Sequence, residues 1–318
     1  MKNNYIVIDA GGTNIKLGLI TDGNLIKSTS ISSFSENGLV NRLSEISKIT
    51  KDWLQSQKVD GIGLAFAGIV DFDKACVISV NDKFKDTTNF NFTNWAFSAL
   101  NCPIVMENDA RAALIGEWKY GAGRSSDNVV MLTLGTGIGG SAVINGKILR
   151  GSHYQAGCLL GHFTIDYLGK KCNCGNIGCV ETVASTWALP EIVKGATEFK
   201  LSSLATEVVI DFETIFRLAN KGDILALKIR EQCLKTWAVA TVNAIHAYDP
   251  EIVVLGGGVM KSGDVIIKYI KRYIDQFAWT PWGKVELKIA DLENDAALWG
   301  MYHLLNEKFN NYKYDKLC

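Results

Sequence analysis

The sequence lacks an excess of charge of either sign. Its 318 residues include 33 lysines and arginines and 33 aspartates and glutamates, so the formal net charge is zero. A protein that binds nucleic acid or an anionic membrane surface usually presents a basic face. We therefore expect neither of these partners.

Long hydrophobic runs are also absent. The first apolar run, YIVIDAGGT, is short and is interrupted by Asp9 and two glycines, so it does not have the form of a secretory signal. No stretch approaches the roughly twenty apolar residues that a membrane-spanning helix needs. We therefore expect a cytoplasmic protein. In that reducing compartment clustered cysteines more often bind metal than form disulfides.

The chain contains an internal repeat. An apolar strand, a Gly-Gly-Thr turn, a second strand, an Asp-Gly turn and a third strand open the sequence, and VVMLTLGTGIGGSAVINGKILRG repeats this pattern from Asn128. Such a repeat, in a chain too long for one core, predicts two related α/β lobes with a cleft between them. We assign residues 1–119 to a small lobe and 120–293 to a larger one. A last helix at about 294–308 is expected to pack back onto the small lobe, and the polar tail beyond it is expected to be frayed.

Three strands run directly into glycines, in IDAGGTNIK at 8–16, LGTGIGG at 134–140 and LGGGV at 255–259. Backbone N–H groups beside glycines can approach an anion closely. In the first of these turns Thr13 adds a hydroxyl, Lys16 could add charge, and Asp9 could hold a metal-bound water. One such turn alone is as consistent with a plain hairpin, but three in one chain favour phosphate binding.

The segment MENDARAA, residues 106–113, allows two interpretations. An acid between a buried strand and a helix is well placed to act as a general base on a hydroxyl. Alternatively, Asn108 or Asp109 simply caps the helix. The local sequence by itself favours the cap.

One short segment gathers three of the eight cysteines with one of the four histidines, in the pattern His162-x9-Cys172-x-Cys174-x4-Cys179. Three thiolates and an imidazole complete a tetrahedral set, which predicts a closed, structural zinc site. Gly175 and Gly178 let the backbone fold tightly around an ion. The alternative is a chance cluster of buried side chains, which this spacing disfavours.

Together these residues resemble the ROK family, named for repressors, open reading frames and kinases. The resemblance runs from Tyr5 to about Leu305. It implies a duplicated actin-like ATPase fold of the hexokinase and ribonuclease H type, and an enzyme that phosphorylates sugars with ATP. It rests on six motifs in order: DAGGTNIK, GLAFAGIVD, ENDARAALIGE, LGTGIGG, GH with CNCGNIGCVE, and VVLGGGV.

The resemblance also implies a role for each candidate residue. Asp109 corresponds to the catalytic base, and His162 to a zinc ligand that also shapes the sugar pocket. The other sugar-binding positions are Gly68, Asn81, Asn108 and Glu181. The positions for ATP and Mg²⁺ are Asp9, Gly11, Gly12, Thr13, Lys16, Gly135, Thr136, Gly137, Gly256 and Gly257.

The chain departs from the family at one sugar-binding position. Family kinases usually have Gly-Glu-x-Gly-His where this chain has Cys158-Leu159-Leu160-Gly161-His162. Leu159 cannot accept a hydrogen bond from a sugar hydroxyl, and an unpaired buried hydroxyl costs about 1–3 kcal/mol. We therefore expect either a sugar that is altered near carbon one or two, or weak activity on glucose.

Two functional classes follow from the resemblance. The first is an ATP-dependent kinase of a hexose or a hexose derivative, acting at the 6-hydroxyl, with a homodimer expected. The second is a non-catalytic sugar sensor that acts through protein contacts. A repressor of this family carries a DNA-binding domain before the first phosphate motif, which begins here at Ile6, so we expect no such domain.

Overall fold

The computed structural model describes residues 3–55, 57–81 and 83–314. Their contacts divide the chain into two compact units. The first contains the chain up to Arg124, residues Arg150–Ala156, and the chain from Asp295 onward, and the second contains Ser125–Leu149 and Gly157–Asn294. The sequence predicts one lobe over 120–293, whereas residues 120–124 and 150–156 make their contacts within the first unit.

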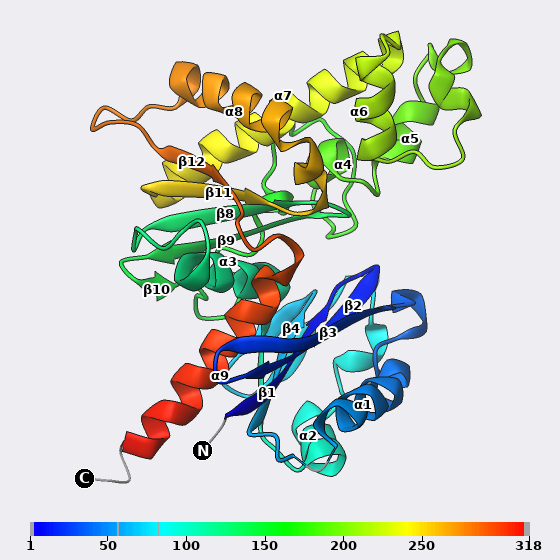
Figure 1. Ribbon diagram of the computed structural model, residues 1–318. Coiled ribbons are helices and arrows are strands. Elements are labelled where there is room, and N and C mark those ends of the chain that lie inside the picture. The colour runs from blue at the N-terminus through cyan, green and yellow to red at the C-terminus, as the bar shows by residue number, and fades with distance from the viewer. Residues whose placement is uncertain (1–2, 56, 82, 315–318) are drawn as a thin grey trace. The chain divides into compact units, whose positions relative to one another are not determined.

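The first unit is built on a five-stranded sheet (Figure 1) with the order β3-β2-β1-β4-β7. Its first three strands form the predicted antiparallel meander, while β1, β4 and β7 run parallel. Because β1 and β7 are parallel, the residues that follow each of them emerge at the same edge of the sheet. The strands are β1 (Asn4–Ala10), β2 (Asn14–Thr21), β3 (Asn24–Ser32), β4 (Gly61–Phe66) and β7 (Ile104–Asn108).

Helices cover both faces of this sheet, since every residue of β4 is buried and every residue of β1 except Asp9. Ile6 and Ile8 belong to the core that includes Leu43 of α1, whereas Tyr5 packs edge-on against Tyr302 of α9. The helices of this unit are α1 (Val40–Leu54), α2 (Phe92–Leu100), α3 (Asp109–Tyr120) and α9 (Ala296–Tyr314). A small hairpin, β5 (Ile69–Asp71) with β6 (Cys76–Ser79), was not predicted.

The last helix is longer than expected. The polar tail was expected to fray, but α9 continues to Tyr314. The contact of Phe309 with Gly61 of β4 gives the physical reason, because a ring packed on the sheet stabilises the last helical turns.

The second unit repeats the same sheet, with the order β10-β9-β8-β11-β12. Again the first three strands along the chain are antiparallel and the β8, β11 and β12 strands are parallel. The predicted duplication is therefore confirmed, although β12 had not been predicted. The strands are β8 (Val129–Leu134), β9 (Ile138–Ile144), β10 (Lys147–Ile148), β11 (Ile252–Gly256) and β12 (Glu286–Ile289).

The core of the second unit centres on a long helix, α7 (Ile224–Tyr248). Trp237 on this helix is fully buried, and its indole N–H donates a 2.9 Å hydrogen bond to the carbonyl of Ala184. The helix ends where Asp249 adopts a left-handed backbone before Pro250. The other helices of this unit are α4 (Glu181–Ala184), α5 (Leu189–Lys194), α6 (Phe212–Asn220) and α8 (Gly263–Phe277).

Short 3₁₀ helices complete the described chain: η1 (Ser35–Asn37), η2 (Lys85–Thr87), η3 (Leu160–His162), η4 (Phe199–Leu201), η5 (Ser203–Thr206), η6 (Gly258–Ser262) and η7 (Glu293–Asp295). Among the residues described, no helix combines the length and the apolar character needed to cross a membrane.

Candidate functional site

Two carboxylates lie at one edge of the first sheet. Asp9 is the penultimate residue of β1, and Asp109 directly follows β7. Burial raises the pKa of Asp9, the neighbouring charge of Asp109 adds to this effect and Lys16 opposes it, and the resulting pKa is about 7. The two acids are therefore close enough to repel each other, as carboxylates that share one site do.

Asn108, not Asp109, caps helix α3. Its Oδ1 atom accepts a 3.1 Å hydrogen bond from Arg111 N, and its Nδ2 atom donates to the carbonyl of Gly68 at 3.1 Å and to Asp109 Oδ1 at 3.0 Å. The cap interpretation therefore holds for Asn108. The carboxylate of Asp109 does not cap the helix, so the general-base interpretation of this motif stays a prediction for Asp109.

The carboxylate of Asp109 is held by one oxygen. Oδ1 accepts hydrogen bonds from Asn108 Nδ2 and, at 2.8 Å, from Ala110 N. No described residue donates a hydrogen bond to Oδ2. Burial raises the pKa of Asp109, the hydrogen bonds of its carboxylate and the charge of Lys83 offset part of this effect, and the resulting pKa is about 6. A carboxylate with one fixed oxygen and a raised pKa suits a general base.

A buried charge network lies directly before Asp109. Glu107 is fully buried, and its Oε1 atom accepts hydrogen bonds from Asn108 N at 2.9 Å and from Arg111 Nη1 at 3.2 Å. Its Oε2 atom accepts a 2.7 Å bond from Arg150 Nε. Arg111, also fully buried, donates from Nη2 to the carbonyls of Tyr154 and Ala156 at 2.6 and 3.1 Å. This network was not predicted, although a glutamate inside an apolar strand was a signal for it in the sequence.

The first glycine turn joins β1 to β2. The carbonyl of Gly12 accepts hydrogen bonds from the hydroxyls of Ser33 and Ser35 at 2.9 and 2.8 Å. Both serines are buried, which fixes the turn from one side. Thr13 is exposed. This arrangement holds the turn in one conformation before any anion binds.

Two lysines lie near this edge. Lys16, a predicted ATP-binding residue, forms an ion pair with Asp295 at 2.6 Å. Lys83, for which no role was predicted, lies with its side chain against Gly12. No local pattern marks Lys83, because its contact with Gly12 is made only by the fold. Asn81, two residues earlier, is exposed.

The two glycine turns of the second unit lie next to each other, because β8 and β11 are paired in parallel with Thr133 opposite Gly256. In the turn after β8, the carbonyl of Gly135 accepts hydrogen bonds from the backbone and hydroxyl of Thr186, and Thr136 is exposed. Gly257 has a φ of 92° and lies so close to the backbone of Leu134 that a side chain there would overlap it. Glycine is thus required at this junction.

Glu181 connects the cysteine segment to the second glycine turn. It is buried at the start of α4, and its Oε1 atom accepts a 2.6 Å hydrogen bond from Ile138 N, at the end of that turn. Its Oε2 atom accepts a 3.3 Å bond from the indole of Trp187. Cys179 lies two residues earlier, so a shift of the cysteine segment would move the turn.

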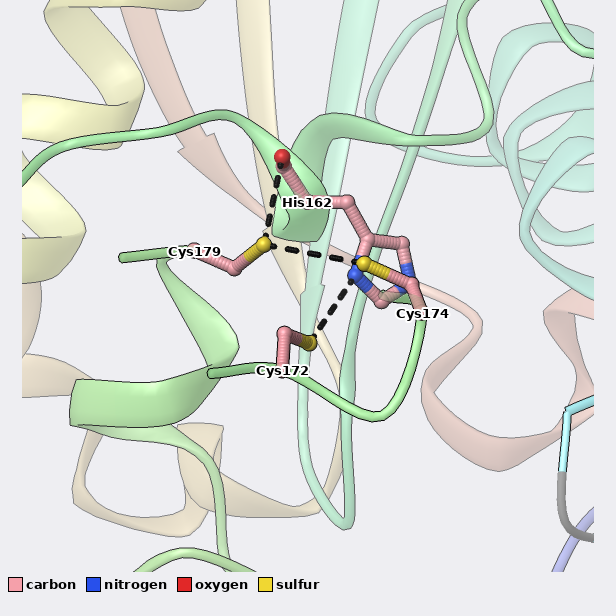
Figure 2. Close-up of side chains that lie close together, drawn as sticks. All are labelled: His162, Cys172, Cys174 and Cys179. Carbon is pink, nitrogen blue, oxygen red and sulfur yellow. Dashed lines mark hydrogen bonds between the residues drawn. The ribbon is translucent and has the colours of Figure 1, made fainter. Parts of the chain in front are cut away.

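Figure 2 shows His162 and the three cysteines pointing toward one another. Their four potential ligand atoms lie within 4.8 Å of one another. The distance between His162 Nδ1 and Cys172 Sγ is 3.6 Å, and that between Cys174 Sγ and Cys179 Sγ is 3.7 Å. A zinc ion with Zn–S bonds of about 2.3 Å separates its sulfur ligands by roughly 3.8 Å, so the donor set fits tetrahedral zinc.

The backbone of the cysteine segment is shaped for such a centre. Gly175 and Gly178 have φ values of 93° and 65°, and Gly178 lies directly against the carbonyl of Asp166. Gly175 N donates a 3.0 Å hydrogen bond to the carbonyl of Cys172, which closes the turn. Just before this centre, half-buried Leu159 precedes η3, and Leu160 is buried against Gly140.

Comparison with known proteins identifies the class. The pattern that defines the ROK family matches residues 5–308, so the chain belongs to this family. It is 34% identical over 327 residues to a glucokinase of Halalkalibacterium halodurans, with 96% of each chain covered. It is 30% identical over 314 residues to a glucokinase of Thermotoga maritima, covering 96% of this chain and 98% of that one.

A solved structure agrees with the sequence comparisons. The fold matches a ROK family glucokinase from Streptomyces griseus, crystallised in complex with glucose and AMPPNP, with a TM-score of 0.79 and 26% identity. The match covers 95% of this chain and 99% of the other. The predicted actin-like fold of this family is thereby confirmed.

The charge network around Glu107 can be tested by stability. Glu107→Leu leaves the buried Arg111 without its carboxylate, so we expect the free energy of unfolding to fall by about 3–5 kcal/mol. Urea unfolding followed by circular dichroism measures this loss. Glu45→Gln, which removes only the surface ion pair with Arg42, is the matched control and should leave the midpoint nearly unchanged. A loss no larger than the control's would contradict the network's role.

Proposed function

We propose that this protein is an ATP-dependent sugar kinase that phosphorylates a hexose or hexose derivative at its 6-hydroxyl, with Asp109 as the general base. The observation that carries the proposal is the Asp109 carboxylate, held through Oδ1 alone beside a glycine turn, in a chain of the ROK family. Similarity to the glucokinases described above supports ATP and a hexose as the substrates.

In this mechanism Asp109 orients one sugar hydroxyl and accepts its proton on Oδ2. Phosphoryl transfer depends more on positioning and charge neutralisation than on covalent chemistry by the protein. Asn108 keeps Asp109 in place, because both hydrogens of its amide are already donated to Gly68 and Asp109. Only a remaining lone pair of Asn108 Oδ1 is then available to a sugar.

The glycine turns at Gly11–Gly12, Gly135–Gly137 and Gly256–Gly257 would hold the phosphates of the nucleotide through backbone N–H groups. Bound Mg²⁺ would neutralise phosphate charge in this mechanism. Asp9 would hold the hydrated cation as a carboxylate, because a nearby cation favours the charged form of an acid.

We further propose that His162, Cys172, Cys174 and Cys179 hold a structural zinc ion. Such an ion would fix the start of α4 and therefore Glu181, whose carboxylate accepts from Ile138 N. In this way the metal centre would position the second glycine turn without taking part in the chemistry.

The substrate is tested by ADP release with Mg·ATP across free hexoses, N-acylhexosamines and glycosides substituted at carbon one. We expect turnover, with a preference for a sugar altered near carbon one or two because of Leu159. If a sugar binds but no sugar of the panel is turned over, the kinase proposal is wrong and the non-catalytic sensor is the better description of the function.

Replacement of the base gives a sharper test. Asp109→Asn should lower kcat by about 10²- to 10⁴-fold, because the amide cannot accept the proton. Sugar affinity, followed by titration calorimetry, should change little. Asp52→Asn, at an exposed position of α1, is the control and should leave kcat unchanged. Equal turnover in Asp109→Asn would remove this residue from its role.

The pH dependence follows from the raised pKa of Asp109. Only the carboxylate can accept a proton, so kcat/KM should rise with pH through about 6 and be lost below it. An ordinary aspartate would give this limb near pH 4. Asp9 has a raised pKa in a similar pH range, but Mg²⁺ competes with the proton for its carboxylate. Any part of the profile that is due to Asp9 should therefore move to lower pH as the Mg²⁺ concentration is raised. A profile that is flat from pH 5 to 8 would contradict the assignment.

The metal proposal predicts a loss of stability. Cys174→Ser should reduce bound zinc, measured by mass spectrometry of the metal, and lower Tm by about 5 °C or more. Treatment of the native protein with a strong chelator should have the same effect. Cys76→Ser, outside the cluster, should keep its zinc. Zinc-free protein with an unchanged Tm would exclude a structural role.

A further inference from the structure

The side chain of Lys83 covers the first glycine turn. A methyl group built on Gly12 would overlap the Lys83 ammonium and would lie 2.8 and 2.9 Å from Cδ and Cε. The whole outer half of the lysine therefore lies on the glycine, which leaves room for it only because Gly12 has no side chain. Since the Gly12 carbonyl is held by Ser33 and Ser35, this contact is with a fixed turn.

The same ammonium acts on the proposed base. The positive charge of Lys83 lowers the pKa of Asp109, against the effect of burial. Lys83 thus lies within electrostatic reach of Asp109 while it touches Gly12. A point between the glycine turn and the base is also where a phosphoryl group would pass from the donor to a sugar hydroxyl, if the proposed function is correct.

Within residues 3–55, 57–81 and 83–314, no carboxylate forms an ion pair with the Lys83 ammonium and no acceptor takes a hydrogen bond from it. Lys16, by contrast, is neutralised by Asp295. Half-buried Lys83 therefore holds three donors ready at the turn, and a compact ammonium is a common ligand of phosphate oxygens.

We propose that Lys83 is a further catalytic residue, which binds the terminal phosphate of the donor and neutralises its charge during transfer to the sugar. This inference rests on the proposed kinase function and adds a residue to it. The positive charge that binds phosphate at the first glycine turn would then come from Lys83, in the segment after β6, and not from Lys16 on β2. The resulting pair consists of Asp109 for the hydroxyl and Lys83 for the phosphate.

The test compares three variants in the full-length protein. Lys83→Met removes the charge and keeps the length, Lys83→Arg keeps the charge, and Lys48→Met makes the same change at an exposed position of α1. Dissociation constants for Mg·AMPPNP and for AMP are measured by calorimetry, and kcat and KM by ADP release. Loss of a charge-assisted hydrogen bond corresponds to a change of roughly tenfold to hundredfold.

We expect Lys83→Met to weaken Mg·AMPPNP binding and to reduce kcat/KM for ATP by about that factor, with unchanged affinity for AMP and for the sugar. Lys83→Arg should recover part of the loss, and Lys48→Met should match the native protein. Native values in Lys83→Met would overturn the proposal. So would an equal loss of AMPPNP and AMP affinity together with a lower Tm, since that result indicates a purely structural role.

The two proposals fail in different ways. If the native protein turns over a sugar and Lys83→Met does so equally well, the kinase function stands and the role of Lys83 is wrong. If the native protein phosphorylates no sugar, the kinase function fails and the transfer role of Lys83 fails with it. The calorimetry then still decides whether Lys83 binds a terminal phosphate.

Discussion

The buried carboxylate of Glu107 is the constraint on which the active edge of the first unit depends. A charge without access to water must be met by protein groups, and breaking one partner of such a network is costly. Here the partners are Asn108 N at the end of β7, Arg111 on α3 and Arg150 from a distant segment. The hydrogen bonds that pair with this carboxylate therefore fix the point where β7 ends and α3 begins, and with it the position of Asp109.

Duplication of the sheet gives both units a glycine turn at the carboxyl ends of parallel strands, but the two turns are held differently. In the first unit two buried serines bond to the Gly12 carbonyl. In the second, the carboxylate of Glu181 bonds to Ile138 N, and Glu181 begins its helix two residues after Cys179 of the cysteine cluster. The same local fold is thus stabilised once by neutral hydroxyls and once by a charged side chain that follows the cysteine segment.

The two aspartates and two lysines at the edge of the first sheet differ in burial and in their ion-pair partners. Burial raises the pKa values of both Asp9 and Asp109, because a carboxylate loses hydration there. Of the two lysines nearby, one is neutralised by Asp295, while the other lies on the glycine turn. This edge is therefore suited to a ligand that brings both negative phosphate and a compensating cation.

The sequence by itself determined the repeated sheets, the glycine turns and the cysteine cluster, since strand alternation, turns and ligand spacing depend on residues that are close along the chain. It also left open which residue of the Asn108–Asp109 pair caps α3. Only the tertiary structure decided that question. It also decided three contacts: the pairing of Glu107 with Arg150, the contact of Phe309 that extends α9, and the place of Lys83 over Gly12. These depend on strand register and on segments far apart in the chain, and no local periodicity records which side chains such packing brings together.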